Sequence, residues 1–278
     1  MNALHFISGL PRSGSTLLAG LLRQNPRFHA AMTSPVGPMV QALLATFTPQ
    51  NETAVFLDDV RRQAILCAAI EAYYQPQADK DVRFDTNRLW CAQLPLLRAL
   101  YPHAKVLCCV RDIAWIMDSF ERLVRRNAFE PSRLFANNDE RATVYSRTET
   151  LERRDRVVGF AHSALKEAYY GEQSDALLII EYDLLTRQPL DCLKLIYGFL
   201  EQPWFAHDVD HVDYDEPEFD RQLGAPGLHT VSGPVRVNQR QTILPPDIIG
   251  KYQNLAFWRD PKGTKAFRIT QTATTNPA

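Results

Sequence analysis

A short segment near the N-terminus constrains this chain more than any other. The apolar run Phe6-Ile7-Ser8 is followed by a turn between Gly9 and Gly14, and a helical pattern starts at Thr16. The two glycines have the G-x-x-x-x-G spacing of a phosphate-binding loop, and Thr16 stands where that motif keeps its hydroxyl. The pattern therefore predicts a strand, a loop and a helix whose backbone N–H groups converge on an anion.

The loop departs from that of nucleoside triphosphatases at one position. Ser15 stands where the phosphate-binding lysine is expected, and Arg12 is the loop's positive side chain. A nucleoside triphosphate needs a cation at its β- and γ-phosphates and usually a hydroxyl on Mg²⁺. We therefore expect this loop to hold a different terminal anion. A strand-to-helix turn without a ligand is the alternative, and the residues chosen here disfavour it.

The rest of the chain is predicted to form alternating strands and helices. Three strands are expected over residues 81–85, 105–112 and 176–182, and a short one over 28–32. The segment 105–112 is apolar throughout, as in a central parallel strand buried on both faces. The expected helices cover residues 16–24, 51–74, 89–101, 113–126, 150–170, 190–200 and 247–258. This order predicts an α/β fold, a P-loop-like doubly wound parallel sheet flanked by helices.

Length and charge limit the organisation and the partners. We expect one domain over residues 1–278, with an α/β core at 1–203 and a loop-rich segment at 204–278 that closes over a nucleotide. The formal net charge of −1 argues against general binding of nucleic acid or an anionic membrane.

Without a signal-peptide pattern or a bilayer-spanning apolar run, the expected location is cytoplasmic. The five cysteines lack C-x-x-C spacing and are predicted to be reduced core thiols.

Two passages of the C-terminal segment carry clusters of polar residues. Residues 207–216 hold His207 and His211 among aspartates, which a metal site would explain, but a mobile acidic loop near the acceptor explains them better. No metal is expected. Residues 228–240 are basic and irregular, and we expect them to lie over a cofactor. Residues 270–278 are expected to form a frayed tail.

Three ordered motifs give the chain a family likeness. Residues 6–18 resemble the 5′-phosphosulfate loop of sulfotransferases, and residues 106–119 resemble their 3′-phosphate segment, in which a serine follows an arginine by eight positions. Residues 180–189 resemble a third segment of that family. The loop sequence Pro-Arg-Ser-Gly-Ser-Thr is most similar to bacterial and tyrosylprotein-type members. The resemblance implies 3′-phosphoadenosine 5′-phosphosulfate (PAPS) as donor, 3′,5′-diphosphoadenosine (PAP) as product and no catalytic metal.

The resemblance also implies roles for individual residues. The 5′-phosphosulfate would be held by the loop residues Arg12, Ser13, Gly14, Ser15 and Thr16. The 3′-phosphate would be held by Arg111 and Ser119, and the adenine would lie near Tyr182. A lid that contains Ser232 and Gly233 would cover the nucleotide.

The catalytic base is not given by the resemblance. Residues 31–34, where tyrosylprotein-type enzymes carry an acidic pair, contain no carboxylate. Asp85 is the first candidate because it ends a strand that faces the same crevice, and His29 is the second. Many sulfotransferases keep a lysine where this chain has Thr86. Either Arg88 supplies that charge or Arg12 acts alone at the leaving group.

Two other functions remain open on the sequence. A P-loop kinase or NTPase is one, although Ser15 and Arg111 stand where that class needs a lysine and a carboxylate. A nucleotide-binding regulator without catalysis is the other. The acceptor is a peptide tyrosine, a sugar, a phenol or another small molecule, and the oligomeric state is not set by the sequence.

Overall fold

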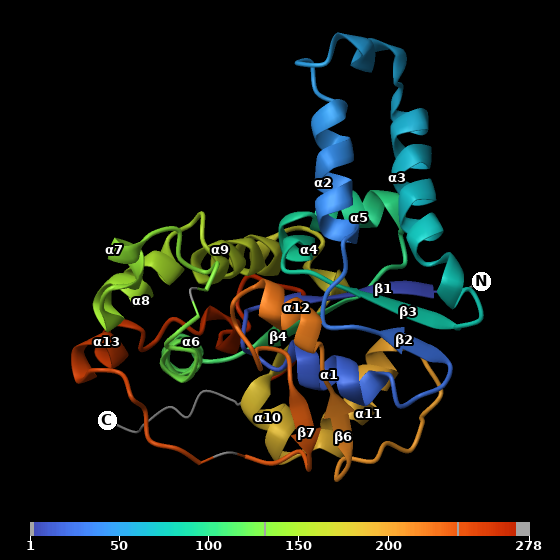
Figure 1. Cartoon of the computed structure of the whole chain (residues 1–278). Helices are drawn as coiled ribbons and strands as arrows, with labels where there is room; N and C mark the ends of the chain where they lie inside the picture. Colours follow the sequence, from blue (N-terminus) through green and yellow to red (C-terminus); the bar gives the residue numbers. More distant parts are fainter. Residues whose placement is uncertain (1–2, 131, 238, 271–278) are drawn as a thin grey trace.

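A single parallel sheet organises the molecule. The computed structural model describes residues 3–130, 132–237 and 239–270 (Figure 1). Its six-stranded sheet has the order β2-β3-β1-β4-β5-β8, and every pairing in it is parallel. The predicted fold class is therefore confirmed. The strands are β1 (Ala3–Gly9), β2 (Phe28–Ala30), β3 (Val82–Thr86), β4 (Val106–Val110), β5 (Leu177–Glu181) and β8 (Phe267–Ile269), and a separate antiparallel pair joins β6 (Val212–Tyr214) to β7 (Val231–Gly233).

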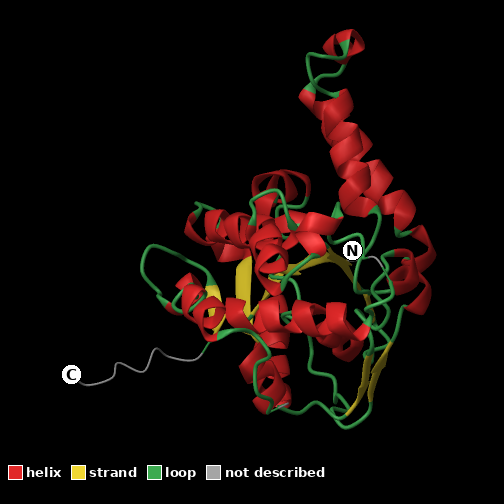
Figure 2. Ribbon diagram, turned by 60° about the vertical axis from the view of Figure 1, so that its left-hand side comes forward, coloured by secondary structure: helices red, strands yellow, loops and turns green. Residues whose placement is uncertain are grey.

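Helices lie on both faces of this sheet, as Figure 2 shows. The first half of the chain contributes α1 (Ser15–Leu22), α2 (Val36–Thr46), α3 (Asp59–Tyr73), α4 (Leu89–Ala92), α5 (Leu94–Leu100) and α6 (Ile113–Arg126). The second half contributes α7 (Asn138–Arg141), α8 (Val144–Glu152), α9 (Val157–Tyr170), α10 (Tyr182–Arg187), α11 (Pro189–Leu200), α12 (Pro217–Gln222) and α13 (Pro246–Lys251).

The alternation of side chains along β4 explains the two layers. Its residues are all fully buried. Val106, Cys108 and Val110 belong to a core shared with α4, α5, α6 and α9, whereas Leu107 and Cys109 belong to a core shared with α1 and α11. Successive residues of a strand point to opposite faces, so an apolar run is needed where both faces are covered.

The strand order also fixes where a ligand can bind. From β1 the chain goes first to the edge strand β2 and returns to β3, which pairs with β1, and it then adds β4, β5 and β8 on the other side of β1. A doubly wound sheet binds ligands beyond the carboxyl ends of the strands where this direction reverses. Here that point lies between β1 and β4, beside the loop at residues 10–14 and beside Arg111.

The helix expected over residues 51–74 is wrong in its first third. A 3₁₀ turn covers Glu52–Phe56, and α3 begins only after Asp58, whose side chain caps the helix by accepting from Arg61 N at 2.8 Å. In addition, the expected helices did not include α2. Together α2 and α3 project from the domain as a hairpin (Figure 1). Val55 at its tip is 79% exposed, so the apolar pattern there does not mark core.

Other boundaries also differ from the expectation. The helix predicted over residues 150–170 is two helices, α8 and α9, because the chain turns at Arg153–Arg156. The helix predicted over 247–258 ends at Lys251. The segment expected to be loop-rich supplies β8 to the main sheet as well as the β6–β7 pair. Residues 271–278 of the expected tail lie outside the described residues. Across the described ranges, no helix is both long and apolar enough to cross a bilayer.

Candidate active site

Two glycines shape the loop that follows β1. A Cβ on Gly9 would lie 2.3 Å from the carbonyl oxygen of Cys109, so only glycine lets β1 and β4 approach this closely. Gly14 has φ of 91° and packs on the ring of Tyr182, where a Cβ would meet a ring carbon at 2.8 Å. The helix α1 then begins at Ser15, and no side chain caps its first N–H groups. Those donors are free to receive an anion.

A cavity of about 470 Å³ opens in front of this loop. It lies at the end of β1 and β4, as the strand order requires. The predicted residues Gly14, Ser15, Thr16, Ser119, Tyr182 and Gly233 line it, and so do Arg12, Arg88 and Arg111. Segments more than two hundred residues apart in the chain therefore meet in one cavity.

The charge of this cavity is one-sided. Among the described lining residues are five arginines and no aspartate or glutamate: Arg12, Arg88, Arg111, Arg236 and Arg240. Burial and the nearby charges of Arg88 and Arg111 lower the pKa of Arg12 to about 10, and burial lowers the pKa of Arg88 to about 10. The Nε atoms of Arg88 and Arg111 are buried without a hydrogen-bond partner among the described residues. Such a cluster is stabilised by a polyanion that supplies the missing acceptors.

Arg12 connects three parts of this cavity. Its backbone has φ of 55°, in the left-handed region that few residues other than glycine adopt. From there its Nε donates to Ser119 Oγ on α6 at 3.0 Å, and its Nη1 donates to the carbonyl oxygen of Leu228. The guanidinium is thus held across the cavity by hydrogen bonds to two uncharged groups, and no carboxylate of the described residues pairs with its charge.

Arg111 is held by aromatic rings. Its guanidinium lies 4.2 Å from the ring centroid of Tyr182 and 6.0 Å from that of Trp115. Asp112 does not pair with it, because the Asp112 carboxylate caps α6 by accepting from Ala114 N at 2.9 Å. Within the described residues Arg111 makes no ion pair, so stacking fixes its position and leaves its hydrogen-bonding edge unused.

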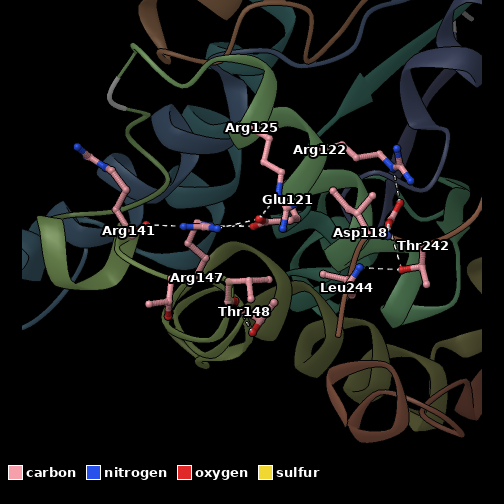
Figure 3. Close-up of polar contacts among 12 residues, drawn as sticks. Asp118, Glu121, Arg122, Arg125, Arg141, Arg147, Thr148, Thr242 and Leu244 are labelled. Atoms are coloured by element: carbon pink, nitrogen blue, oxygen red, sulfur yellow. Dashed lines mark hydrogen bonds and ion pairs between the residues drawn. The ribbon is translucent and has the colours of Figure 1, made fainter. Parts of the chain in front are cut away.

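Two buried carboxylates anchor α6, the helix that carries Ser119 (Figure 3). Asp118 accepts from Ile243 N at 2.8 Å and from Thr242 Oγ1 at 3.1 Å, and Glu121 is bound at both oxygens by Arg147. Asp118 also lies 2.9 Å from Arg240. These contacts fix the C-terminal passage against α6 and so place Arg240 at the cavity.

The structure corrects the expectation that Asp85 acts as the base. Asp85 is fully buried and does not line the cavity. It accepts hydrogen bonds from Tyr74 Oη at 2.5 Å, from Trp90 Nε1 at 2.6 Å and from Ser34 Oγ. Burial raises its pKa, although these three donors oppose the shift. This carboxylate ties β3 to α4 and to the C-terminal end of α3, and it does not face the cavity.

Three further predicted residues do not face the cavity. His29 lies at the edge of the sheet, with its ring 5.8 Å from that of Tyr74. Ser13 is buried, and its Oγ donates to the Pro11 carbonyl at 3.2 Å. Ser232 is exposed because the alternation along β7 sends its side chain away from the cavity that Val231 and Gly233 line.

The sequence patterns do not single out three basic residues that line the cavity. Arg236 and Arg240 lie in the basic passage that was expected to cover a cofactor, and His229 lies in it too. His229 stands beside a buried partner, since its Nδ1 is 2.6 Å from Oδ1 of Asp220. A histidine and an aspartate nine positions apart in irregular sequence carry no recognisable pattern.

The acidic passage has structural contacts. His207 Nε2 lies 2.9 Å from Tyr197 Oη, and His211 Nδ1 lies 2.9 Å from Asp208 Oδ2. Within the part of the chain that the structure describes, no group of three histidine, cysteine, aspartate or glutamate side chains is arranged to hold a metal.

Comparison with known proteins decides the family. Residues 5–206 match the profile of the Sulfotransferase family, which is most of the chain. The chain belongs to the sulfotransferase family. The matched segment contains the loop, Arg88, Arg111, Ser119 and Tyr182, whereas His229, Arg236 and Arg240 lie beyond it.

Individual relatives of this sulfotransferase are distant. It is 24% identical over 211 residues to protein-tyrosine sulfotransferase 1 of Danio rerio, with 72% of this chain and 54% of the relative covered. It is 23% identical over 220 residues to protein-tyrosine sulfotransferase of Drosophila melanogaster, with 76% and 40% covered. The chain thus spans about half the length of the curated relatives that it matches.

Solved sulfotransferases share the fold. The sulfotransferase domain from the curacin biosynthetic pathway superposes with a TM-score of 0.52 at 16% identity, covering 92% of each chain. The sulfotransferase from Alicyclobacillus acidocaldarius gives a TM-score of 0.50 at 15% identity, covering 80% of this chain and 90% of its own. At these identities the likeness concerns the fold.

Proposed function

We propose that this protein transfers a sulfuryl group from PAPS to a hydroxyl acceptor. The observation that carries the proposal is a cavity lined by five arginines and no described carboxylate, placed before a glycine-bracketed loop and the uncapped end of α1. PAPS offers two separate anionic groups, a phosphosulfate and a 3′-phosphate, and the arginines come from several separate segments. Family membership supports the same activity.

The residues divide between the two ends of the donor. The N–H groups of residues 14–16 and the guanidinium of Arg12 would hold the 5′-phosphosulfate. Arg111 would hold the 3′-phosphate with Arg240 and Ser119, and the Tyr182 ring lies where it can support the adenine. The orphaned Nε of Arg111 fits this role. In this proposal the protein's own residues bind both anionic groups, and the absence of a catalytic metal stays a prediction.

Charge development explains what the loop does in the reaction. When the acceptor oxygen attacks sulfur in line, the bond from sulfur to the 5′-phosphate oxygen breaks and negative charge grows on that oxygen. Arg12 and the amides of α1 are fixed donors around the expected position of that oxygen. Arg88, also in the cavity, adds positive charge beside it.

The acceptor is proposed to be a hydroxyl on an apolar or aromatic body. Apolar side chains also line this cavity, among them Phe120, Leu134, Val157, Phe219, Leu223 and Leu228. A sugar would leave its hydroxyls unpaired against these residues, whereas a phenol buries its ring there. Peptide tyrosine, the acceptor named for the two curated relatives, belongs to this class.

Radiolabelled transfer tests the proposal. The protein is incubated with ³⁵S-labelled PAPS and with a tyrosine peptide, 2-naphthol or an oligosaccharide. Label should pass to the tyrosine peptide or to 2-naphthol without added metal. Hydrolysis or transfer of the γ-phosphate of MgATP would instead support the alternative that the protein is a P-loop kinase or NTPase. PAP binding without transfer to any acceptor would support a regulator. The cytoplasmic location and the single-domain organisation remain predictions.

A further inference from the structure

One titratable side chain in the cavity has no role in binding the donor. His229 lines the cavity with a side chain 12% exposed. Its Nδ1 lies 2.6 Å from Oδ1 of Asp220, a residue of α12 that is fully buried. The other oxygen of Asp220 accepts from the backbone N of His229 at 2.8 Å. The ring is therefore held at one nitrogen, and Nε2 has no partner among the described residues.

We propose that His229, oriented by Asp220, is the general base that takes the proton from the acceptor hydroxyl. The inference rests on the proposed function. An imidazole whose Nδ1–H donates to a carboxylate presents the lone pair of Nε2, which is the arrangement that a general base requires. Neither residue belongs to the motifs that carry the family resemblance.

The position of His229 suits the chemistry. The preceding carbonyl, that of Leu228, accepts a hydrogen bond from Arg12, so the proposed base and the proposed leaving-group cation are joined through one peptide unit. The ring of Phe219, one of the apolar lining residues, lies 5.7 Å from the His229 ring. His229 thus stands where the arginine part of the cavity meets the apolar part.

The charges around His229 keep it ready to accept a proton. Burial lowers its pKa, and Arg88 and Arg12 lower it further, while the carboxylate of Asp220 on α12 opposes them. The ring is consequently neutral at pH 7. In the proposed step the acceptor proton passes to Nε2, the acceptor oxygen bonds to sulfur, and the electron pair of the broken sulfur–oxygen bond stays on PAP. The proton then leaves His229 to solvent.

His229→Asn is the decisive variant. Its amide N–H can still donate to Asp220, but nothing replaces Nε2. We expect kcat for transfer from PAPS to 2-naphthol or the tyrosine peptide to fall by about 10²- to 10⁴-fold, the usual contribution of a general base. The dissociation constant for PAP should change by less than about threefold. Adding imidazole to His229→Gly should restore part of kcat, which a purely structural histidine would not allow.

The pH profile gives a second readout. Wild-type kcat/KM, which reports the free enzyme, should fall with acid through a pKa below the ordinary 6.5 of histidine, and that limb should vanish in His229→Asn. If wild type transfers sulfate and His229→Asn keeps kcat within tenfold, the inference is overturned while the proposed function stands. If wild type neither binds PAP nor transfers label, the proposed function itself fails. Should His229→Asn not fold, a wild-type profile that is flat from pH 5 to 8 overturns the inference.

Discussion

Arg12 Nε donates a hydrogen bond of 3.0 Å to Ser119 Oγ, joining the loop after β1 to the first turns of α6. The sequence motifs assign these two residues to opposite ends of the donor, the phosphosulfate and the 3′-phosphate. Their contact means that the two ends of the proposed donor site are not independent. A change in α6 is therefore transmitted to the loop through a single side chain.

Removal of Arg12 should affect catalysis more than folding. Arg12→Ala removes the cation that we propose to face the developing charge, so kcat should fall by roughly a hundredfold or more. The melting temperature should change little, because Arg12 forms no ion pair with any described residue. Arg126→Ala is the matched control, since it removes an exposed arginine that does not line the cavity. A kcat near wild type in purified Arg12→Ala would exclude Arg12 as the leaving-group cation.

Arg111 should decide the preference for a 3′-phosphate. Hydrogen bonds to charged groups contribute roughly 1.5–3 kcal/mol, so PAP should bind at least about tenfold more tightly than adenosine 5′-phosphate in calorimetry without Mg²⁺. Arg111→Ala should nearly abolish this difference. Arg126→Ala, which removes an exposed arginine at the end of α6, should preserve it. Equal weakening of both nucleotides in Arg111→Ala would mean that Arg111 only supports the fold.

Asp85→Asn should lower stability without removing the base. The amide cannot accept all three hydrogen bonds that the carboxylate receives, which should cost about 1–3 kcal/mol of unfolding free energy. Thermal melts should show a clear drop, while kcat of the folded variant and its pH profile stay close to wild type. A loss of kcat of a hundredfold at unchanged stability would return Asp85 to the reaction.

His5 should make stability depend on pH. It is buried in β1, its Nδ1 accepts from Lys105 N at 3.1 Å, and burial lowers its pKa to about 4. Between pH 6.5 and 4 the unfolded chain binds a proton that the folded protein does not, so stability falls as pH falls through this window and is flat above it. One pKa unit corresponds to about 1.4 kcal/mol, so roughly 2–3 kcal/mol should be lost by pH 4.5.

Denaturant unfolding at pH 7 and pH 4.5 measures this effect. His5→Asn should lose less stability between the two pH values than wild type does, by that same 2–3 kcal/mol. His103→Gln, which changes an exposed histidine, should behave as wild type. If His5→Asn shows the full wild-type dependence, the acid sensitivity arises from other groups.

The sequence was sufficient to predict an element where the local hydrophobic pattern agreed with burial in the folded protein. The helix over residues 113–126 was predicted with its exact bounds, since Asp112 caps its start and Arg125 and Arg126 lie in its last turn. The hairpin of α2 and α3 was missed for the opposite reason. Val55, Phe56 and Val60 are apolar but exposed, so hydrophobicity alone suggested a continuous packed helix where the chain turns in solvent.

The sequence by itself determined the glycine-bracketed loop after β1, the parallel sheet, and the positions of Arg111 just after β4 and of Ser119 on α6. These features can be predicted locally, because backbone preferences and the hydrophobic period of two residues in a strand or 3.6 in a helix are visible within one segment of sequence. The tertiary structure decided which polar residues meet. It placed Asp85 in a closed set of hydrogen bonds and brought His229, Arg236 and Arg240 to the loop from the other end of the chain. Pairings of this kind depend on how distant segments pack, and no local spacing encodes them.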